Sequence, residues 1–182
     1  MNRRYQGPIK LVLFDVDGVL TDGSLHLDGQ GEALKTFNVR DGLAVALLRA
    51  HGILSGILSG KSSASLDYRI RQLQFDVVVT GRLDKSEAYA AIKREHALDD
   101  AQIAYIGDDV VDLPLAGRVG NFYAPSDAHP LVLKSANHVL KTAGGRGVAR
   151  ELAEHLLQND GLSLEAAYAP LIEQWGHIHA VQ

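Results

Sequence analysis

Residues 9–22, Ile-Lys-Leu-Val-Leu-Phe-Asp-Val-Asp-Gly-Val-Leu-Thr-Asp, decide the fold class. The apolar run Ile9–Phe14 is typical of a buried β-strand. Two acids, Asp15 and Asp17, follow this run directly. A strand-end turn with a helix cap is the alternative interpretation, but an acid in such a turn seldom recurs two residues later. The stretch therefore predicts a buried strand that delivers carboxylates to one edge of a sheet.

The rest of the chain alternates short apolar runs with segments of helical periodicity. Further strands are predicted at 53–58, 75–79, 103–106 and 121–124, and helices at 42–51, 62–73, 85–97, 109–116, 128–135 and 147–158. This alternation predicts an α/β fold in which a central parallel sheet lies between two layers of helices. Residues 24–37 break the alternation, because two apolar segments flank Asp28-Gly29-Gln30-Gly31, whose glycines suit a tight turn. We expect a β-hairpin here, with a long irregular loop as the alternative.

The composition indicates one globular domain. We expect a single domain over residues 1–182, with its core at about 8–158 and a helical C-terminal extension at 159–182. Cysteine is absent, which excludes thiolate catalysis, iron–sulfur clusters and cysteine zinc sites. The net charge of −4 provides no overall field for nucleic acid or an anionic membrane, so we expect neither as a partner. No signal peptide or membrane span is visible, and we expect a cytoplasmic protein.

Polar residues follow the other predicted strands and favour phosphoryl chemistry. Ser59-Gly60-Lys61 follows the second strand, Lys85 opens the helix after the third, and Gly107-Asp108-Asp109, with Asp112 beyond it, follows the fourth. Ligands of open parallel sheets bind beyond the carboxyl ends of the strands. Crowded carboxylates repel one another unless a cation neutralises them, and Mg²⁺ prefers such oxygen ligands. A hydroxyl and an ammonium suit the oxygens of a phosphoryl group.

Each feature also has an ordinary structural explanation. Small residues such as Ser59 are common at strand ends, and a lysine in a first helical turn, such as Lys85, usually faces solvent. Acids at a helix start, such as Asp109 and Asp112, interact favourably with the helix dipole. The eight histidines are scattered and are interpreted as surface or core residues. The features together, in this order, point to a phosphoryl-transfer site far more specifically than any one alone.

The motifs resemble those of the haloacid dehalogenase (HAD) superfamily. The segment 15–22 resembles its first motif, Ser59 its second, Lys85 its third and Gly107-Asp108-Asp109-x-x-Asp112 its fourth. The resemblance implies a HAD-like Rossmannoid three-layer sandwich with a central parallel sheet and a β-hairpin flap after the first strand. It also implies that Asp15 is the nucleophile of an aspartyl-phosphate mechanism and that Asp17 is the general acid and base. The implied Mg²⁺ ligands are Asp15, the backbone carbonyl of Asp17 and Asp108, with Asp109 and Asp112 orienting them.

The segments 37–42 and 143–151 are similar to the small, capless branch of the superfamily, whose members hydrolyse phosphorylated sugar acids. Only 44 residues separate Asp15 from Ser59, and 26 separate Ser59 from Lys85, so neither interval can hold a cap domain. The family usually has Thr-Gly-Arg at its second motif, where this chain has Ser59-Gly60-Lys61, and lysine lacks the bidentate fork of arginine. A sialic-acid-type 2-keto acid phosphate with nine carbons therefore stays open as an alternative substrate.

Several residues are expected to bind the substrate. Lys61 and Arg69 are eight residues apart and are expected to face one side at the start of the second crossover helix, although Arg69 as a solvated helix residue is the alternative. The full expected set is Asp17, Asn38, Arg40, Asp41, Gly42, Gly60, Lys61, Arg69, Lys85 and Arg146.

Assembly is expected to complete the site, because a capless monomer would leave the rim open to water. The resemblance implies a homotetramer in which the hairpin at 24–37 makes subunit contacts. A flexible Gly144–Gly147 stretch is expected to bring Arg146 near a neighbour's site, and a place at an ordinary helix N-terminus is the alternative for Arg146.

Proteins of two other functional classes share some of these features. A response-regulator receiver domain also combines acids, a hydroxyl and a lysine, but it carries its phosphoacceptor on the third strand, where this chain has Thr80 and no aspartate. A non-catalytic relative that serves only oligomerisation is disfavoured, because every catalytic position is filled.

Overall fold

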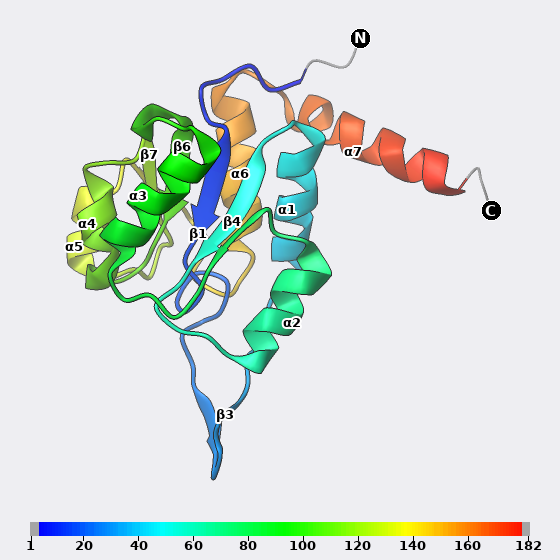
Figure 1. Cartoon of the computed structure of the whole chain (residues 1–182). Coiled ribbons are helices and arrows are strands. Elements are labelled where there is room, and N and C mark those ends of the chain that lie inside the picture. Colours follow the sequence, from blue (N-terminus) through cyan, green and yellow to red (C-terminus); the bar gives the residue numbers. More distant parts are fainter. Residues whose placement is uncertain (1–3, 180–182) are drawn as a thin grey trace.

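The computed structural model describes residues 4–179, and its centre is a six-stranded parallel sheet (Figure 1). The strands are β1 (Leu11–Phe14), β4 (Leu54–Leu58), β5 (Val77–Val79), β6 (Ile103–Ile106), β7 (Asn121–Ala124) and β8 (His138–Val139). Their order, β5-β4-β1-β6-β7-β8, places β1 in the interior between β4 and β6. The predicted α/β fold is confirmed. Strand β8 was not predicted, because two residues are too few to show a periodic pattern.

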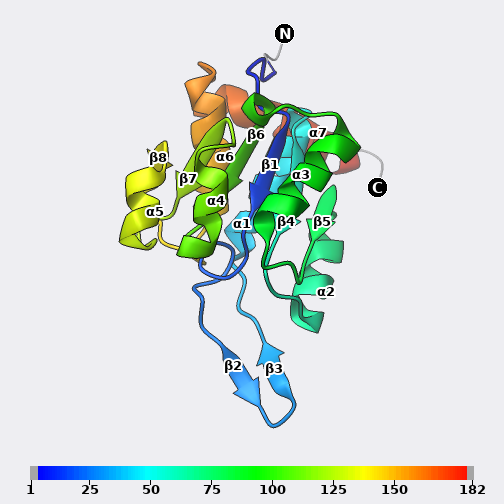
Figure 2. The ribbon, with the colours of Figure 1, turned by 60° about the vertical axis from the view of Figure 1, so that its left-hand side comes forward.

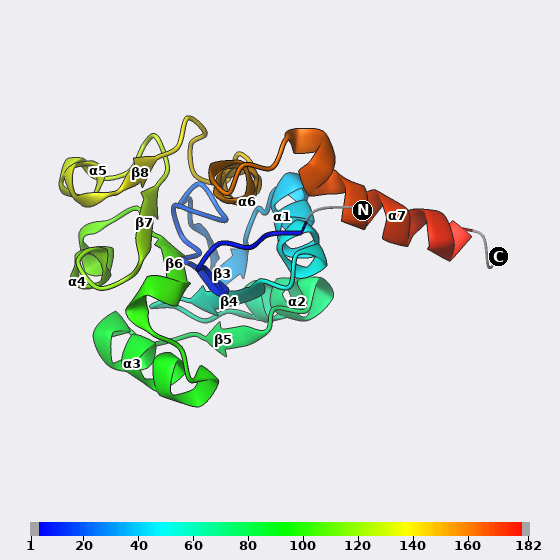
Figure 3. The ribbon, with the colours of Figure 1, turned by 90° about the horizontal axis from the view of Figure 1, so that it is seen from above.

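Helices cover both faces of the sheet (Figure 3). They are α1 (Val39–Ala50), α2 (Ala64–Leu73), α3 (Lys85–His96), α4 (Leu113–Ala116), α5 (Pro130–Ser135), α6 (Val148–Asn159) and α7 (Leu164–His179), with 3₁₀ turns η1 (Asp100–Gln102) and η2 (Val110–Asp112). The predicted helix at 109–116 is wrong in form, since it is η2 followed by the short α4. Pro114 has no N–H to donate to the carbonyl of Val110, so a continuous α-helix over 109–116 would lose that hydrogen bond.

The alternation of side chains along β1 builds the two halves of the core. Val12 and Phe14 pack in a cluster with α1, α2, α6 and α7, whereas Leu11 and Leu13 pack with α3, α4 and α5. All four side chains are fully buried. Because β1 is held on both sides and both faces, the turn that follows it starts from a rigid base.

The predicted hairpin is confirmed as β2 (His26–Asp28) paired with β3 (Gly31–Leu34). It projects beyond the carboxyl ends of the sheet strands, away from the body of the molecule (Figures 1 and 2). Leu25, Leu27 and Leu34 are about half exposed or more on it. Between β1 and β4 the chain holds only this hairpin and α1, so no cap domain is inserted there.

The last helix, α7, lies within the predicted helical extension at 159–182. Ala167 and Leu171 of α7 are buried in the cluster that also contains α1 and α6. His51 connects the same region, since its Nδ1 accepts a hydrogen bond from the Tyr5 N–H and its Nε2 lies 2.8 Å from the Ala167 carbonyl. None of the helices between residues 4 and 179 combines the length and apolar character needed to cross a membrane. Residues 1–3 and 180–182 of the predicted domain lie outside the described residues.

Candidate active site

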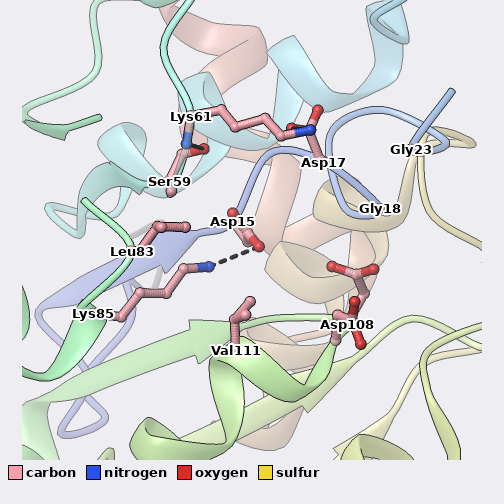
Figure 4. A pocket seen from close by; sticks show the side chains of 12 residues that line it. Asp15, Asp17, Gly18, Gly23, Ser59, Lys61, Leu83, Lys85, Asp108 and Val111 are labelled. Carbon is pink, nitrogen blue, oxygen red and sulfur yellow. Dashed lines mark hydrogen bonds and ion pairs between the residues drawn. The ribbon is translucent and has the colours of Figure 1, made fainter. Parts of the chain in front are cut away.

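A cavity of about 360 Å³ opens at the carboxyl ends of β1, β4 and β6 (Figure 4). It brings together residues from all four predicted motifs. The predicted residues that line it are Asp15, Asp17, Ser59, Gly60, Lys61, Lys85, Asp108 and Asp109. Sequence reasoning missed four further lining residues, Gly18, Gly23, Leu83 and Val111, which carry no charge to mark them.

Asp15 lies at the bottom of this cavity and is 6% exposed. Its Oδ1 accepts a hydrogen bond of 2.7 Å from the Val16 N–H, and its Oδ2 lies 2.7 Å from the Lys85 Nζ. Burial raises the pKa of Asp15 to about 6, and the ammonium of Lys85 opposes that rise. The Val16 N–H and the Lys85 ammonium therefore hold the Asp15 carboxylate in one orientation.

Lys85 belongs to a buried polar cluster, so the solvent-facing alternative for this lysine is wrong. Asp112 Oδ1 lies 2.5 Å from both the Lys85 Nζ and the Tyr105 hydroxyl, and Asp112 Oδ2 accepts hydrogen bonds from the N–H groups of Asp108 and Asp109. Burial opposes the charge of Lys85, but Asp15 and Asp112 raise its pKa above the ordinary value. All four contacts of Asp112 are donors, which suits the orienting role expected for this residue. Tyr105 was not predicted, since a tyrosine at the end of a buried strand gives no sign of a polar role.

Three carboxylates converge beside this cluster. Oxygens of Asp15, Asp108 and Asp112 all lie within 4.8 Å of one another. Burial raises the pKa of Asp108 to about 8, and the charges of Asp15, Asp112 and Asp109 add to the rise. Such a concentration of buried negative charge fits a divalent cation with oxygen ligands. Because the oxygens of Asp112 already accept four hydrogen bonds, Asp15 and Asp108 are the carboxylates of this group best placed to hold an ion.

A glycine allows the first loop to approach Asp108. Gly18 has a φ of +80°, a conformation that L side chains rarely adopt, and a Cβ there would lie 1.9 Å from Asp108 Oδ2. Glycine at position 18 therefore lets the loop after β1 and the loop after β6 share one small space. Figure 4 shows Gly18 next to the Asp108 carboxylate on one side of the cavity.

The mouth of the cavity is formed by Asp17, Ser59 and Lys61. Ser59 is buried, and its Oγ accepts a hydrogen bond from the Lys61 N–H. The Lys61 ammonium lies 3.8 Å from Asp17 Oδ2 and its side chain is largely exposed. Asp17 Oδ1 contacts Lys35, a hairpin residue that was not predicted. Asp109 is exposed and caps η2 through the Val110 N–H.

The remaining predicted substrate residues of α1 and α2 do not line this cavity within one chain. Asn38 caps α1 and also donates to the Gly145 carbonyl. Arg69 donates to the Asn38 carbonyl, and with Arg40 and Gly42 it borders a separate hollow between α1, α2 and α7. The expectation that Lys61 and Arg69 share one side of a helix is wrong, because Lys61 precedes the Ser63 cap of α2.

Asp41 has a structural position rather than a place in the cavity. It is buried, and its Oδ1 accepts a hydrogen bond from the Ala149 N–H in the first turn of α6. The N-cap position of helix α6 is Gly147, which has no side chain to cap the helix. Asp41 therefore supplies that cap from α1, and burial raises its pKa to about 6.

The Gly144–Gly147 stretch, which was expected to be flexible, forms a tight turn packed on the first loop. The Gly145 N–H donates to the Val19 carbonyl at 2.8 Å, and a Cβ at Gly144 would lie 2.0 Å from the Gly18 carbonyl oxygen. These glycines allow close approach of two backbones. Arg146 is exposed directly before the first turn of α6, and its guanidinium lies 4.0 Å from Asp22 of the same chain.

The chain is similar to known proteins along most of its length. A haloacid dehalogenase-like hydrolase family model matches residues 68–152. The 3-deoxy-D-manno-octulosonate 8-phosphate phosphatase of Haemophilus influenzae is 44% identical over 85% of this chain and 86% of the relative. Its cobalt-bound structure covers 85% of this chain and 90% of that one, with a TM-score of 0.82. The Moraxella catarrhalis phosphatase of the same name, solved with magnesium, phosphate and the sugar acid, is 32% identical, with a TM-score of 0.80 and coverage of 84% and 87%.

Proposed function

Because the chain belongs to the 3-deoxy-D-manno-octulosonate 8-phosphate (KDO 8-phosphate) phosphatase family of haloacid dehalogenase-like hydrolases, we propose that it hydrolyses KDO 8-phosphate to KDO and phosphate. As a phosphoric monoester hydrolase it is neither a receiver domain nor a non-catalytic relative. The observation that carries the proposal is the meeting of Asp15, Ser59, Lys85 and Asp108 in one cavity. Such a reaction belongs in lipopolysaccharide precursor synthesis.

In the first step, a carboxylate oxygen of Asp15 attacks the phosphorus. The bond between phosphorus and the sugar oxygen breaks, and an aspartyl-phosphate forms. The fixed orientation of Asp15 by Val16 and Lys85 supports this role, since an oriented nucleophile needs no rearrangement before attack. Ser59 and Lys85 are placed to hold the phosphoryl oxygens as they gain charge.

Asp17 is proposed to transfer the protons. It gives a proton to the leaving sugar oxygen, and it then takes one from the water that attacks the aspartyl-phosphate. This second step releases phosphate and restores Asp15. The place of Asp17 at the mouth of the cavity, above Asp15, supports the assignment, since the leaving alcohol must face outward.

The cavity also supports a Mg²⁺ cofactor. Asp15 and Asp108 would hold the ion together with the backbone carbonyl of Asp17, and Asp112 would orient these groups from below. When bound, Mg²⁺ neutralises the carboxylates and the charge of the substrate phosphate.

We also propose that the chain assembles as a cytoplasmic homotetramer whose neighbours complete the substrate site. The exposed leucines of the hairpin and the residues Asn38, Arg40, Gly42, Arg69 and Arg146, which do not line the cavity of their own chain, suit such contacts. Light scattering is expected to give about four times the monomer mass, and a strictly monomeric, active and selective enzyme would contradict the tetramer.

The function is tested by comparing kcat/KM for KDO 8-phosphate, a nine-carbon 2-keto acid 9-phosphate and a sugar phosphate without a carboxylate. We expect the first to be preferred, and activity to disappear with a chelator and return with Mg²⁺. Preference for the nine-carbon substrate would move the assignment to the sialic-acid type. Equal values for all three would contradict a sugar-acid phosphatase.

A further inference from the structure

Lys35 lies at the base of the hairpin, directly after β3. Its ammonium is buried and its side chain is 1% exposed, although Leu34 and Thr36 on either side of it in the chain are exposed. The Nζ atom lies 2.5 Å from Asp17 Oδ1 and 3.0 Å from Glu32 Oε2. Glu32 belongs to β3 and Asp17 to the loop after β1. The lysine therefore joins the hairpin to a residue that lines the cavity.

The other contacts of Asp17 are longer. The Thr21 hydroxyl lies 3.5 Å from Oδ1, at the limit of a hydrogen bond, and the largely exposed Lys61 lies 3.8 Å from Oδ2. Among residues 4–179, Lys35 thus makes the one short side-chain contact of Asp17. With Oδ1 fixed in this way, Oδ2 stays on the side of Lys61 and the cavity mouth.

Burial of an ammonium is unfavourable unless carboxylates compensate it closely, and here two do. Glu32 holds the lysine from the hairpin side, and its second oxygen, Oε1, is buried with no hydrogen-bond partner among the described residues. An ordinary surface ion pair does not bury its ammonium between two carboxylates. Lys93 and Asp100 on the far side of the molecule approach to 2.6 Å while both stay partly exposed.

We propose that Lys35 is a positioning residue for hydrolysis, which acts from the hairpin by holding Asp17 so that Oδ2 meets the leaving oxygen of the substrate. The inference rests on the proposed role of Asp17 as general acid. It assigns the hairpin of each chain a function in its own site, since movement of β3 would carry Lys35 away from Asp17. Glu32 supports this function indirectly, by fixing the lysine.

Lys35→Met tests the proposal on aryl phosphates whose leaving phenols range from p-nitrophenol to unsubstituted phenol. These substrates carry no carboxylate, so loss of a sugar-acid contact cannot affect them. A basic leaving group depends on proton donation, and p-nitrophenol hardly does. Because kcat/KM covers the steps up to release of the phenol, we expect a loss of about 10- to 100-fold with phenyl phosphate and less than about 3-fold with p-nitrophenyl phosphate. Lys35→Arg is expected to restore most of the loss, and Lys93→Met, the matched control, to change neither rate.

An equal loss across the series would overturn the proposal, since it would show only a structural role for Lys35. No loss with any substrate would overturn it as well. Asp17→Asn separates this failure from that of the proposed function. If Asp17→Asn shows no dependence on the leaving group, the general-acid assignment itself fails. If Asp17→Asn shows the dependence and Lys35→Met does not, the inference about Lys35 alone fails.

If Lys35→Met does not fold, as judged by thermal melting, Glu32→Gln tests the positioning role of Lys35 instead. We expect this variant to loosen Lys35 and to lose about 3- to 10-fold with phenyl phosphate, with little change for p-nitrophenyl phosphate. A loss of equal size for both substrates would overturn the proposal.

Discussion

Replacing Asp112 by asparagine perturbs the buried cluster that holds Lys85, while side-chain size is kept. One oxygen of Asp112 accepts hydrogen bonds from Lys85 and Tyr105, and the other accepts hydrogen bonds from the N–H groups of Asp108 and Asp109. Whichever way the new amide turns, its NH₂ group faces two donors. If the NH₂ group faces Asp108 and Asp109, both hydrogen bonds from their N–H groups are lost. If it faces Lys85 and Tyr105, the bond from the ammonium is lost, while the Tyr105 hydroxyl can turn and accept from the amide.

The magnitude follows from the hydrogen bonds that are lost. A hydrogen bond to a charged group contributes about 1.5–3 kcal/mol, so one or two contribute about 1.5–6 kcal/mol. Loss of the negative charge offsets part of this, because the charge of Asp112 contributes to the raised pKa of Asp15 and of Asp108. We expect a net loss of about 2–4 kcal/mol, which lowers the Tm of a chain of this length by about 5–15 °C. The looser Lys85 is expected to reduce kcat by about 10- to 100-fold.

Urea unfolding followed by circular dichroism measures this loss, and Asp100→Asn is the matched control. Asp100 likewise accepts hydrogen bonds from a lysine and a tyrosine, Lys93 and Tyr89, each at 2.6 Å, but its side chain is 46% exposed. The control is expected to lose less than about 1 kcal/mol. A loss below about 1 kcal/mol for Asp112→Asn, or equal losses for both variants, would refute the argument that burial makes this cluster strong.

Three further predictions concern the first loop, the metal and pH. Gly18→Ala is expected to lose more than about 100-fold in kcat, because the new Cβ would displace the Asp108 carboxylate. The control Gly52→Ala has a similar φ of +75° but open space around it, so it is expected to lose only about 1–2 kcal/mol of stability and to keep its kcat. Similar kcat values for the two variants would contradict this prediction. Mg²⁺ at about 100 times its Kd is expected to stabilise the protein by about 2.7 kcal/mol, and Asp108→Asn to remove the resulting rise in Tm; a rise unchanged in that variant would place the ion elsewhere. Burial raises the pKa of Asp41 to about 6, so the folded state binds more protons than the unfolded state between about pH 4 and 6, and the stability contributed by Asp41 falls as pH rises through that window. Asp41→Asn is therefore expected to be up to about 3 kcal/mol more stable than the wild type at pH 8 and equally stable near pH 4, by urea unfolding; a pH-independent difference would contradict the raised pKa.

The sheet and the cavity could be predicted because their signals are local. The apolar run before Asp15 marks β1, and parallel strands bring the polar residues at their carboxyl ends to one edge. Ser59, Lys85 and Asp108 each follow a strand closely, so their convergence needed no knowledge of packing. The hairpin could be predicted for the same reason, because its glycines are a local signal for a turn.

Contacts between distant segments could not be predicted in this way. Lys35 lies in an exposed hairpin, and nothing in its neighbours shows that its ammonium turns back to Asp17. Asp41 resembles a polar residue in a first helical turn, but its carboxylate caps α6, 108 residues later in the chain. The glycines at 144–147 suggest flexibility, whereas they allow a close approach to the loop at Gly18. In each case the partner is set by tertiary packing.

The central claim is that Asp15 in this cavity attacks the phosphate of a sugar acid. The most direct measurement is the initial rate of phosphate release from KDO 8-phosphate with Mg²⁺, for the wild type and for Asp15→Asn at equal folded concentration. We expect the wild type to release one phosphate per sugar acid formed, and the variant to be slower by at least about a thousandfold while melting cooperatively. A folded Asp15→Asn variant with near wild-type phosphate release would contradict the claim.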